Sequence, residues 1–348
     1  NGSVKSIEAN PIRISLKKAS LFSKSVTNIY IRNRAVPFQF IPITGTESNS
    51  QFHLEKDKFI AKGRWNDIEY QCVLQLSNKS LSWQWSIEIN NTSSNNVELD
   101  IFYVQDVGLK SQSDGLVNEY YVSQYIERLI LEDQKYGKVV CCRQNMRESN
   151  GQPWLMVACN AGALAASPDG MQFFGKTFRA TGIPEGLLSH SLGGEYAGES
   201  SVIALQSKPI NLIPYEKQSI GFVAKYLSDH PLATSSDDLN LLPSLMMEFE
   251  ENTPVLLQSD GKYPAKSIFS TSPLLPAEEL SEEELTKFFG KGRAHLEKQN
   301  GEILSFFSDA KNHIVLKAKE LLADRQHGHI MQAKAGLVPN ESIMSTNT

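Results

Sequence analysis

The sequence predicts a mainly β protein, in which a large antiparallel β-sandwich is followed by an α-helical linker. Two observations support this. Short apolar–polar alternations, separated by Gly, Pro, Asn and Asp clusters, run through most of the 348 residues and are typical of antiparallel strands joined by turns. After the segment STSPLLPAEE, apolar residues recur at helical spacing instead. We therefore expect a sandwich over residues 1–272 and a helical linker over residues 273–330.

The clearest strand pattern lies in LSWQWSIEIN (residues 81–90). Its odd-numbered positions, including Trp83 and Trp85, are apolar, and the positions between them are polar, which is the pattern of a half-buried strand. The segment EYQCVLQLS (residues 69–77) precedes it across NKS, so the two predict a hairpin. We interpret both tryptophans as core residues rather than a platform for stacking on sugars.

Strands separated by short turns continue along the chain. Such spacing predicts a sandwich or a barrel, and large sandwiches exceed 200 residues as single domains. The remaining candidates are VELDIFYVQDVGL (97–109), GKVVCCRQN (137–145), PWLMVACN (153–160), ALAASPDGMQFFG (163–175) with a Pro-Asp-Gly turn inside it, SSVIALQS (200–207) and KQSIGFVAKYL (217–227).

The segment NEYYVSQYIERLILEDQKYGKVVCCRQN (residues 118–145) combines apolar residues with many hydrogen-bonding side chains. Its first half also carries apolar residues at helical spacing. However, no helix N-cap precedes it, and EDQKYG reads as a turn into a strand. We therefore expect a hairpin here.

Five polar or aromatic side chains lie near the open end of this hairpin. Arg143 and Asn145 are expected on one face, with Tyr121, Gln124 and Tyr125 at the start of the partner segment. Hydroxyl, amide and guanidinium groups match sugar hydroxyls, so these five residues are candidates for binding a polyhydroxyl ligand. The alternative is a buried polar network that holds two sheets in register.

Three helices are expected after residue 280. Ser281 and Glu284 form a capping box, and Gly290 suits the end of the helix that follows. A second helix is expected over Arg293–Gln299, ending at Asn300-Gly301, and a third over Asp309–Arg325. Because these helices have little of their own to bury, we expect them to pack on further protein.

Composition excludes several classes of partner. The net charge of −5 and the absence of a Lys/Arg run argue against nucleic acid or an anionic membrane as partner. No stretch reaches the roughly 18 apolar residues of a membrane helix, and we expect a cytoplasmic protein. The four cysteines, Cys72, Cys141, Cys142 and Cys159, lack zinc-site spacing. We interpret them as reduced thiols, with Cys141 and Cys142 on opposite faces of a strand.

Catalytic motifs are hard to find. No phosphate-binding loop, nucleophile elbow or HExxH motif is present. His190 with Glu195 and Glu199 could make a general acid–base pair, but their glycine-rich setting indicates a loop. His327 and His329 could bind a metal, yet no third ligand stands at suitable spacing, and we predict no metal site.

Several separated segments together resemble one family. These are YVQDVGL, NEYYVSQYI, KYGKVVCCRQN, SPDGMQFFG, GEILSFF, HIVLKAKELLADRQHGHIM and AGLVPNESIM. They resemble the amino-terminal half of the inverting phosphorylases of glycoside hydrolase family 94, and within it the group that acts on β-1,2-linked oligoglucans. The likeness covers most of the chain and keeps the order of its motifs.

The resemblance implies an architecture and a reaction. The sandwich would be a supersandwich of the galactose-mutarotase type, and residues 331–348 would begin an (α/α)6 barrel that carries the catalytic Asp. Inorganic phosphate would be the co-substrate, with no organic cofactor, and a β-1,2-linked glucooligosaccharide would be cleaved to α-glucose 1-phosphate. This chain would then hold no catalytic residue and be inactive alone; its partners would be the sugar, the downstream barrel and a second subunit in a homodimer. The alternatives are a mutarotase-like enzyme and a non-catalytic carbohydrate-binding module.

Overall fold

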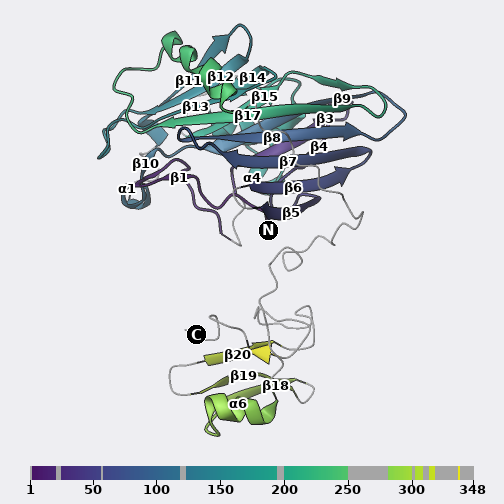
Figure 1. Ribbon diagram of the computed structural model, residues 1–348, viewed down its shortest axis with the longest axis vertical. Helices are drawn as coiled ribbons and strands as arrows, with labels where there is room; N and C mark the ends of the chain where they lie inside the picture. Colours follow the sequence, from purple (N-terminus) through teal and green to yellow (C-terminus); the bar gives the residue numbers. More distant parts are fainter. Residues whose placement is uncertain are drawn as a thin grey trace. The chain divides into compact units, whose positions relative to one another are not determined.

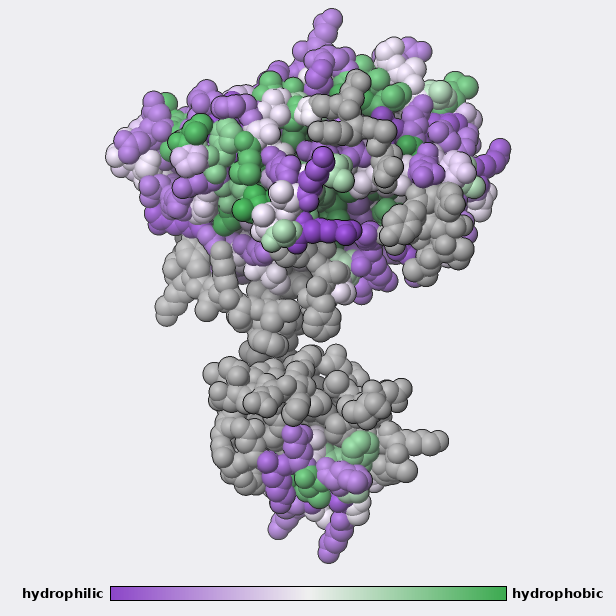
Figure 2. Space-filling model, turned by 180° about the vertical axis from the view of Figure 1, so that it is seen from behind, coloured by the Kyte–Doolittle hydropathy of each residue, from purple (hydrophilic) through white to green (hydrophobic). Residues whose placement is uncertain are grey.

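The computed structural model describes residues 2–20, 25–55, 58–117, 123–193, 200–249, 281–299, 302–308, 313–317 and 336–337. The chain divides into two compact units, Asn1–Thr271 and Ser272–Thr348, and each is described by itself. On the face of the first unit that Figure 2 shows, hydrophobic residues lie in small groups among hydrophilic ones.

One large, mainly antiparallel sheet of fourteen strands dominates the first unit (Figure 1). The strand order is β4-β3-β9-β15-β14-β12-β13-β17-β8-β7-β6-β5, with β11 beside β12 and β16 beside β9. The bounds are β3 (Asn28–Asn33), β4 (Gln39–Pro42), β5 (Ser50–Glu55), β6 (Lys58–Trp65), β7 (Ile68–Leu76), β8 (Ser82–Asn91), β9 (Val97–Asp106), β11 (Ile126–Asp133), β12 (Gly137–Gln144), β13 (Trp154–Cys159), β14 (Ala163–Ser167), β15 (Val202–Ser207), β16 (Ile210–Leu212) and β17 (Lys217–Leu227).

The sheet curls so that its two halves pack face to face. Tyr103 of β9 and Phe222 of β17 stack with ring centroids 5.6 Å apart, although four strands separate β9 from β17 in the sheet order. Both rings belong to the largest buried apolar cluster, which also contains Trp83 and Trp85. The predicted mainly β class is therefore confirmed, and both tryptophans are core residues.

Short elements cover the outside of the curled sheet. Helix α5 packs its buried Leu242, Leu245 and Met246 on the outer faces of β12, β13 and β17, and α3 places Phe173 against β9 and β15. The remaining elements of this unit are β1 (Glu8–Ala9), β2 (Ile12–Arg13), β10 (Lys110–Ser111), α1 (Gln112–Val117), α3 (Gly170–Phe174), α4 (Phe178–Thr181), η1 (Glu185–Leu188), η2 (Ser236–Leu241) and α5 (Leu242–Met247).

Both hairpins expected from the sequence are present. β7 pairs with β8, with Leu74 opposite Trp85, and β11 pairs with β12, with Glu127 opposite Arg143. The tight turn into β12 uses Gly137 at φ 66°, where an added Cβ would lie 2.2 Å from the carbonyl oxygen of Ala163. A side chain therefore cannot be accommodated at this turn.

The four cysteines are free and buried. Cys142 faces the inner core, whereas Cys141 faces the outer cluster under α5, so the expected alternation of the two neighbours is confirmed. Burial raises the pKa of Cys142 to about 12, with Arg128 opposing and Glu127 adding to the shift. Burial likewise raises the pKa of Cys159 to about 12. Because these thiols are buried and protonated, we interpret them as unreactive core residues.

The second unit contains one described helix and a four-stranded antiparallel sheet. Helix α6 (Glu282–Phe289) begins with the predicted Ser281–Glu284 capping box and ends at Gly290, which confirms the first predicted helix. The sheet has the order β18-β19-β20-β21. Its strands are β18 (Ala294–Gln299), β19 (Glu302–Phe307), β20 (His313–Lys317) and β21 (Gly336–Leu337).

The helices predicted over Arg293–Gln299 and Asp309–Arg325 are wrong where the structure describes them. β18 occupies the first, and β20 lies inside the second. The physical reason is visible in the sequence between β18 and β19. Asn300-Gly301, read as a helix end, is also the strongest short signal for a β-hairpin, and EILSFF after it alternates with a period of two.

Candidate functional site

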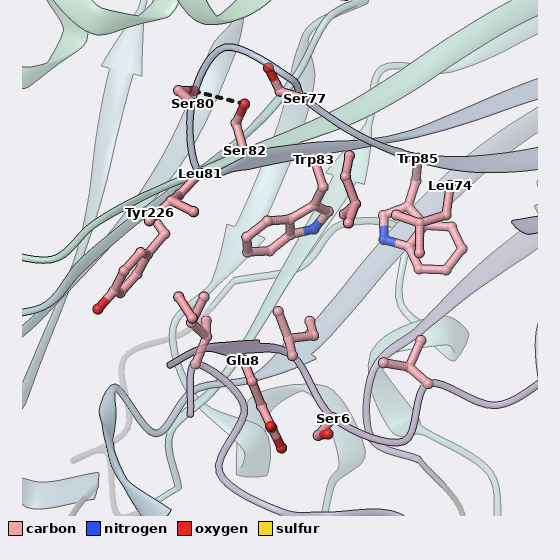
Figure 3. Close-up of a pocket in the computed structure, with 15 residues that line it drawn as sticks. Ser6, Glu8, Leu74, Ser77, Ser80, Leu81, Ser82, Trp83, Trp85 and Tyr226 are labelled. Atoms are coloured by element: carbon pink, nitrogen blue, oxygen red, sulfur yellow. Dashed lines mark hydrogen bonds between the residues drawn. The ribbon is translucent and has the colours of Figure 1, made fainter. Parts of the chain in front are cut away.

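A cleft of about 390 Å³ opens between the amino-terminal segment and the ends of β7 and β8 (Figure 3). We call it the tryptophan cleft, because Trp83 and Trp85 of β8 form one wall together with Leu74 and Tyr226. Apolar residues of the amino-terminal segment, such as Val4, form the other wall. Its volume lies in the lower part of the usual range for small-molecule sites.

The tryptophan cleft is chiefly apolar. Trp83 and Trp85 are only 6% and 2% exposed, so their ring faces are largely packed in the core. In the described part of the chain, Trp85 Nε1 has no hydrogen-bond partner. In Figure 3 the carboxylate of Glu8 points away from the two indoles. This arrangement suits an apolar group better than a ligand covered with hydroxyls.

A charged cluster lies at the rim of the cleft. The carboxylate of Glu248, which follows α5, accepts hydrogen bonds from the hydroxyls of Ser82 at 2.7 Å, Ser77 at 2.8 Å and Ser80 at 2.9 Å. Lys225 Nζ lies 3.5 Å from Glu248 Oε1. Partial burial acts to raise the pKa of Glu248, but the three hydroxyls and Lys225 outweigh it and hold the pKa below its ordinary value. The cluster therefore fixes the end of α5 to the β7–β8 turn.

Neither the cleft nor its rim provides an evident catalytic pair. Glu8 is the one carboxylate among the described residues that line the cleft, and Glu248 is already saturated by its hydroxyl donors. Paired acid–base catalysis needs two groups that can exchange protons with a substrate. No group of three His, Cys, Asp or Glu side chains among the described residues could hold a metal ion.

The predicted site residue Arg143 is buried and fully engaged. Its Nε donates to the carbonyl oxygen of His230 at 2.8 Å, and its Nη2 donates to that of Pro231 at 2.9 Å. Its Nη1 donates to Asn145 Oδ1 at 2.7 Å. Arg143 is 7% exposed, so these contacts match the buried-network alternative raised for it.

The other predicted site residues differ in their surroundings. Asn145 is exposed, and its backbone N–H donates to the carbonyl oxygen of Tyr125 at 2.9 Å. Gln124 is exposed, and Tyr125 is 43% exposed. Tyr121 lies outside the described residues. The hairpin end thus brings Tyr125, Arg143 and Asn145 together, and their contact with a sugar stays a prediction.

A histidine that the sequence analysis did not single out lies beside Arg143. The His230 ring stacks on Trp154 with centroids 4.9 Å apart and planes inclined by 10°. Its Nε2 lies 2.7 Å from Asp238 Oδ1, and its Nδ1 lies 2.8 Å from the carbonyl oxygen of Leu232. Trp154 Nε1 donates to Thr234 Oγ1 at 3.1 Å. No sequence spacing indicated this contact, because the loop after β17 brings these residues onto β13.

The alternative sites considered from the sequence gain no support. The His190 ring packs edge-on against Phe38 with centroids 4.9 Å apart. Its backbone carbonyl accepts from Arg32 at 3.3 Å and from Gln206 at 3.0 Å. Glu195 and Glu199, and likewise His327 and His329, lie outside the described residues.

Comparison with known families identifies the first unit. Residues 1–223 match the SOGP N-terminal domain. The chain belongs to this family. Residues 289–348 match the glycoside phosphorylase supersandwich domain, in agreement with strands rather than helices after residue 293. That match also includes residues 331–348, for which the resemblance implied the start of a barrel.

A curated relative is similar to most of the chain. The chain is 26% identical over 295 residues to a 1,2-beta-oligoglucan phosphorylase from Listeria innocua serovar 6a (strain ATCC BAA-680 / CLIP 11262). The aligned region covers 81% of this chain and 25% of that relative, so the chain spans about a quarter of the relative's length. The recognised resemblance to glycoside phosphorylases is therefore confirmed.

Solved structures give weaker likenesses. A polysaccharide lyase, BACCELL_00875, aligns with a TM-score of 0.42 and 11% identity over 71% of this chain and 33% of its own. A bacterial glucoamylase complexed with acarbose aligns with a TM-score of 0.38 and 8% identity, over 69% of this chain and 32% of its own. A putative kojibiose phosphorylase from the human microbiome aligns with a TM-score of 0.34 and 8% identity, over 70% of this chain and 28% of its own. All three TM-scores are below 0.5.

None of the helices that the structure describes is both long enough and apolar enough to span a membrane.

Proposed function

We propose that this chain is the amino-terminal part of an inverting phosphorylase that cleaves β-1,2-glucooligosaccharides with inorganic phosphate. The observation that carries the proposal is the alignment of 81% of the chain with a 1,2-beta-oligoglucan phosphorylase. The matches to the SOGP N-terminal domain and to a glycoside phosphorylase supersandwich domain, in this order along the chain, support it.

In the proposed reaction, phosphate attacks the anomeric carbon from the face opposite the leaving sugar. The bond from the anomeric carbon to the glycosidic oxygen breaks, a bond from that carbon to a phosphate oxygen forms, and one acid donates its proton to the departing oxygen. The products are α-glucose 1-phosphate and a glucan shortened by one unit. Phosphate replaces the water and the base of an inverting hydrolase, so a single protein acid suffices.

We assign a supporting role to this segment and the acid to the rest of the parent protein. Among the described residues that line the tryptophan cleft, Glu8 is the one carboxylate, which supports placing the acid elsewhere in the parent protein. Tyr121, Gln124, Tyr125 and Asn145 are the residues that we propose for the sugar subsites. Arg143 would hold Asn145 and the adjoining loop in place, as its hydrogen bonds indicate.

A linkage series tests this proposal. The parent protein should release α-glucose 1-phosphate from β-1,2-glucotriose when phosphate is supplied, and much less from β-1,3- or β-1,4-glucotriose. Hydrolysis to free glucose without phosphate would contradict the phosphorylase assignment. A preference for another linkage would contradict the substrate assignment and leave the reaction type standing.

A further inference from the structure

A second pocket lies on the outer face of the curled sheet, away from the inner core. Alternate residues of β3 and β4 point to this face, because successive strand residues face opposite ways. Tyr30 is opposite Pro42 in this pair of strands, and Asn28 lies beside Thr44. These residues enclose about 200 Å³ together with Phe174 of α3 and Phe178 of α4. We call this space the outer-face pocket.

Aromatic rings from two separate parts of the chain form its walls. Tyr30 and Phe40 meet edge to face with centroids 6.3 Å apart on the strand side. The ring centroids of Phe174 and Phe178 lie 4.5 Å apart on the helix side. Tyr30, Phe40, Phe174 and Phe178 are each partly exposed, unlike the tryptophans of the cleft. Each of the four residues therefore keeps part of its surface exposed to solvent.

Polar groups stand among these rings. The Tyr30 hydroxyl makes no hydrogen bond to any described residue. Burial of the phenol, with a further contribution from the Glu47 carboxylate, raises the pKa of Tyr30 well above its ordinary value, so the hydroxyl stays protonated and can donate. Glu47 lines the same pocket. No Lys or Arg is found among the described residues that line it.

This combination selects a class of ligand. The negative charge of the Glu47 carboxylate disfavours phosphate and other anions. A pyranose ring presents C–H groups on its faces, which pack on aromatic rings, and hydroxyls at its edge, which pair with phenol and carboxylate oxygens. The pocket has the size for one ring rather than for a long chain, since its volume is below that of typical drug-sized sites.

We propose that the outer-face pocket binds one glucopyranose unit of a glucooligosaccharide, as a site additional to the place where the bond is cleaved. The proposal rests on the proposed function, because that function supplies the glucan. Tyr30 would donate to a ring hydroxyl, and Phe174 and Phe178 would pack on a sugar face. Such a site would hold the glucan on the protein between successive cleavages.

Titration of the 348-residue chain with β-1,2-glucotriose tests the proposal, by calorimetry and by following aromatic signals in NMR spectra. We expect saturable binding in the millimolar range. Tyr30→Phe removes one hydroxyl and should weaken binding about five- to tenfold, as for the loss of one hydrogen bond. Phe178→Ala should weaken it more than tenfold. Tyr215→Phe is the matched control, since Tyr215 is 72% exposed and does not line the pocket.

Each outcome decides for or against the pocket. Saturable binding that Tyr30→Phe and Phe178→Ala weaken and Tyr215→Phe leaves unchanged, with all variants melting within a few degrees of the wild type, supports it. No binding, or equal binding by all variants, overturns it. If the parent cleaves β-1,2-glucans with phosphate while this chain binds none, only the pocket proposal fails. If the chain binds glucans while the parent lacks phosphorolysis, the proposed function fails instead.

Discussion

Arg143 donates a hydrogen bond from Nε to the backbone carbonyl oxygen of His230, 2.8 Å away. The two residues are 87 positions apart in sequence, and this contact joins the end of the β11–β12 hairpin to the loop after β17. It gives the hairpin end a structural role whether or not that end also meets a sugar.

Replacement of Arg143 should therefore destabilise the fold. In the 348-residue chain, Arg143→Ala leaves the carbonyls of His230 and Pro231 without their donor, and we expect the free energy of unfolding to fall by about 3 kcal/mol. Urea denaturation of the wild type and the variant measures this difference in the free energy of unfolding. Arg147→Ala, a change at an exposed arginine nearby, should alter stability by less than about 0.5 kcal/mol. Equal stabilities of the two variants would refute the structural role.

Tyr125 should behave in the opposite way. Its side chain is 43% exposed, so Tyr125→Ala should change the free energy of unfolding by less than about 0.5 kcal/mol. In the parent protein the same change should raise KM for β-1,2-glucotriose or lower kcat, because a stacking surface for the sugar is lost. Unchanged kinetic constants would remove Tyr125 from the proposed subsites.

Glu248 should make stability depend on acid pH. Its pKa is lower in the folded chain than in the unfolded chain, so its ionised form stabilises the fold above the unfolded value of about 4.3. That contribution is lost as the pH falls through the folded pKa. We expect the melting temperature of Glu248→Gln to be below that of the wild type at pH 6, and the difference to shrink towards pH 3. A difference independent of pH would exclude the carboxylate as its source.

Replacement of Arg32, which forms a buried ion pair with Asp100, should strongly lower the free energy of unfolding of the first unit. Arg32 Nη2 lies 2.6 Å from Asp100 Oδ2, and both side chains are 0% exposed. The guanidinium also lies between the rings of Phe38 and Phe102. Arg32→Met leaves the Asp100 carboxylate with Arg34 as its ion-pair partner, 2.7 Å away, so we expect a loss of about 3 kcal/mol in urea denaturation rather than the larger cost of an unpaired buried charge. A loss below about 1 kcal/mol would contradict the pairing.

The strands predicted from residue 69 onward carry their own signals, whereas the earlier strands β3, β4, β5 and β6 were not predicted. The alternation around Trp83 and Trp85 identifies β8, and EDQKYG identifies the turn between β11 and β12. The second unit was misread at Asn300-Gly301, where one dipeptide suits both a helix end and a hairpin turn. Local sequence cannot separate the two without the pairing of β18 with β19.

The candidate site was predictable only in part. Sequence placed Tyr125, Arg143 and Asn145 at one hairpin end, where the structure also has them. The sequence could not show that the Arg143 guanidinium is already hydrogen-bonded, because two of its acceptors, the carbonyl oxygens of His230 and Pro231, lie in a loop distant in sequence. The outer-face pocket could not be predicted either, since Phe178 and Tyr30 line the same space only after the sheet and its covering helices have formed.

The central claim is that this chain supports a phosphorylase without carrying its acid. Release of α-glucose 1-phosphate from β-1,2-glucotriose and phosphate, measured side by side for the parent protein and for residues 1–348, tests this most directly. The account predicts steady release by the parent and none above background by residues 1–348. Turnover by residues 1–348 alone, or a parent that uses no phosphate, would contradict it.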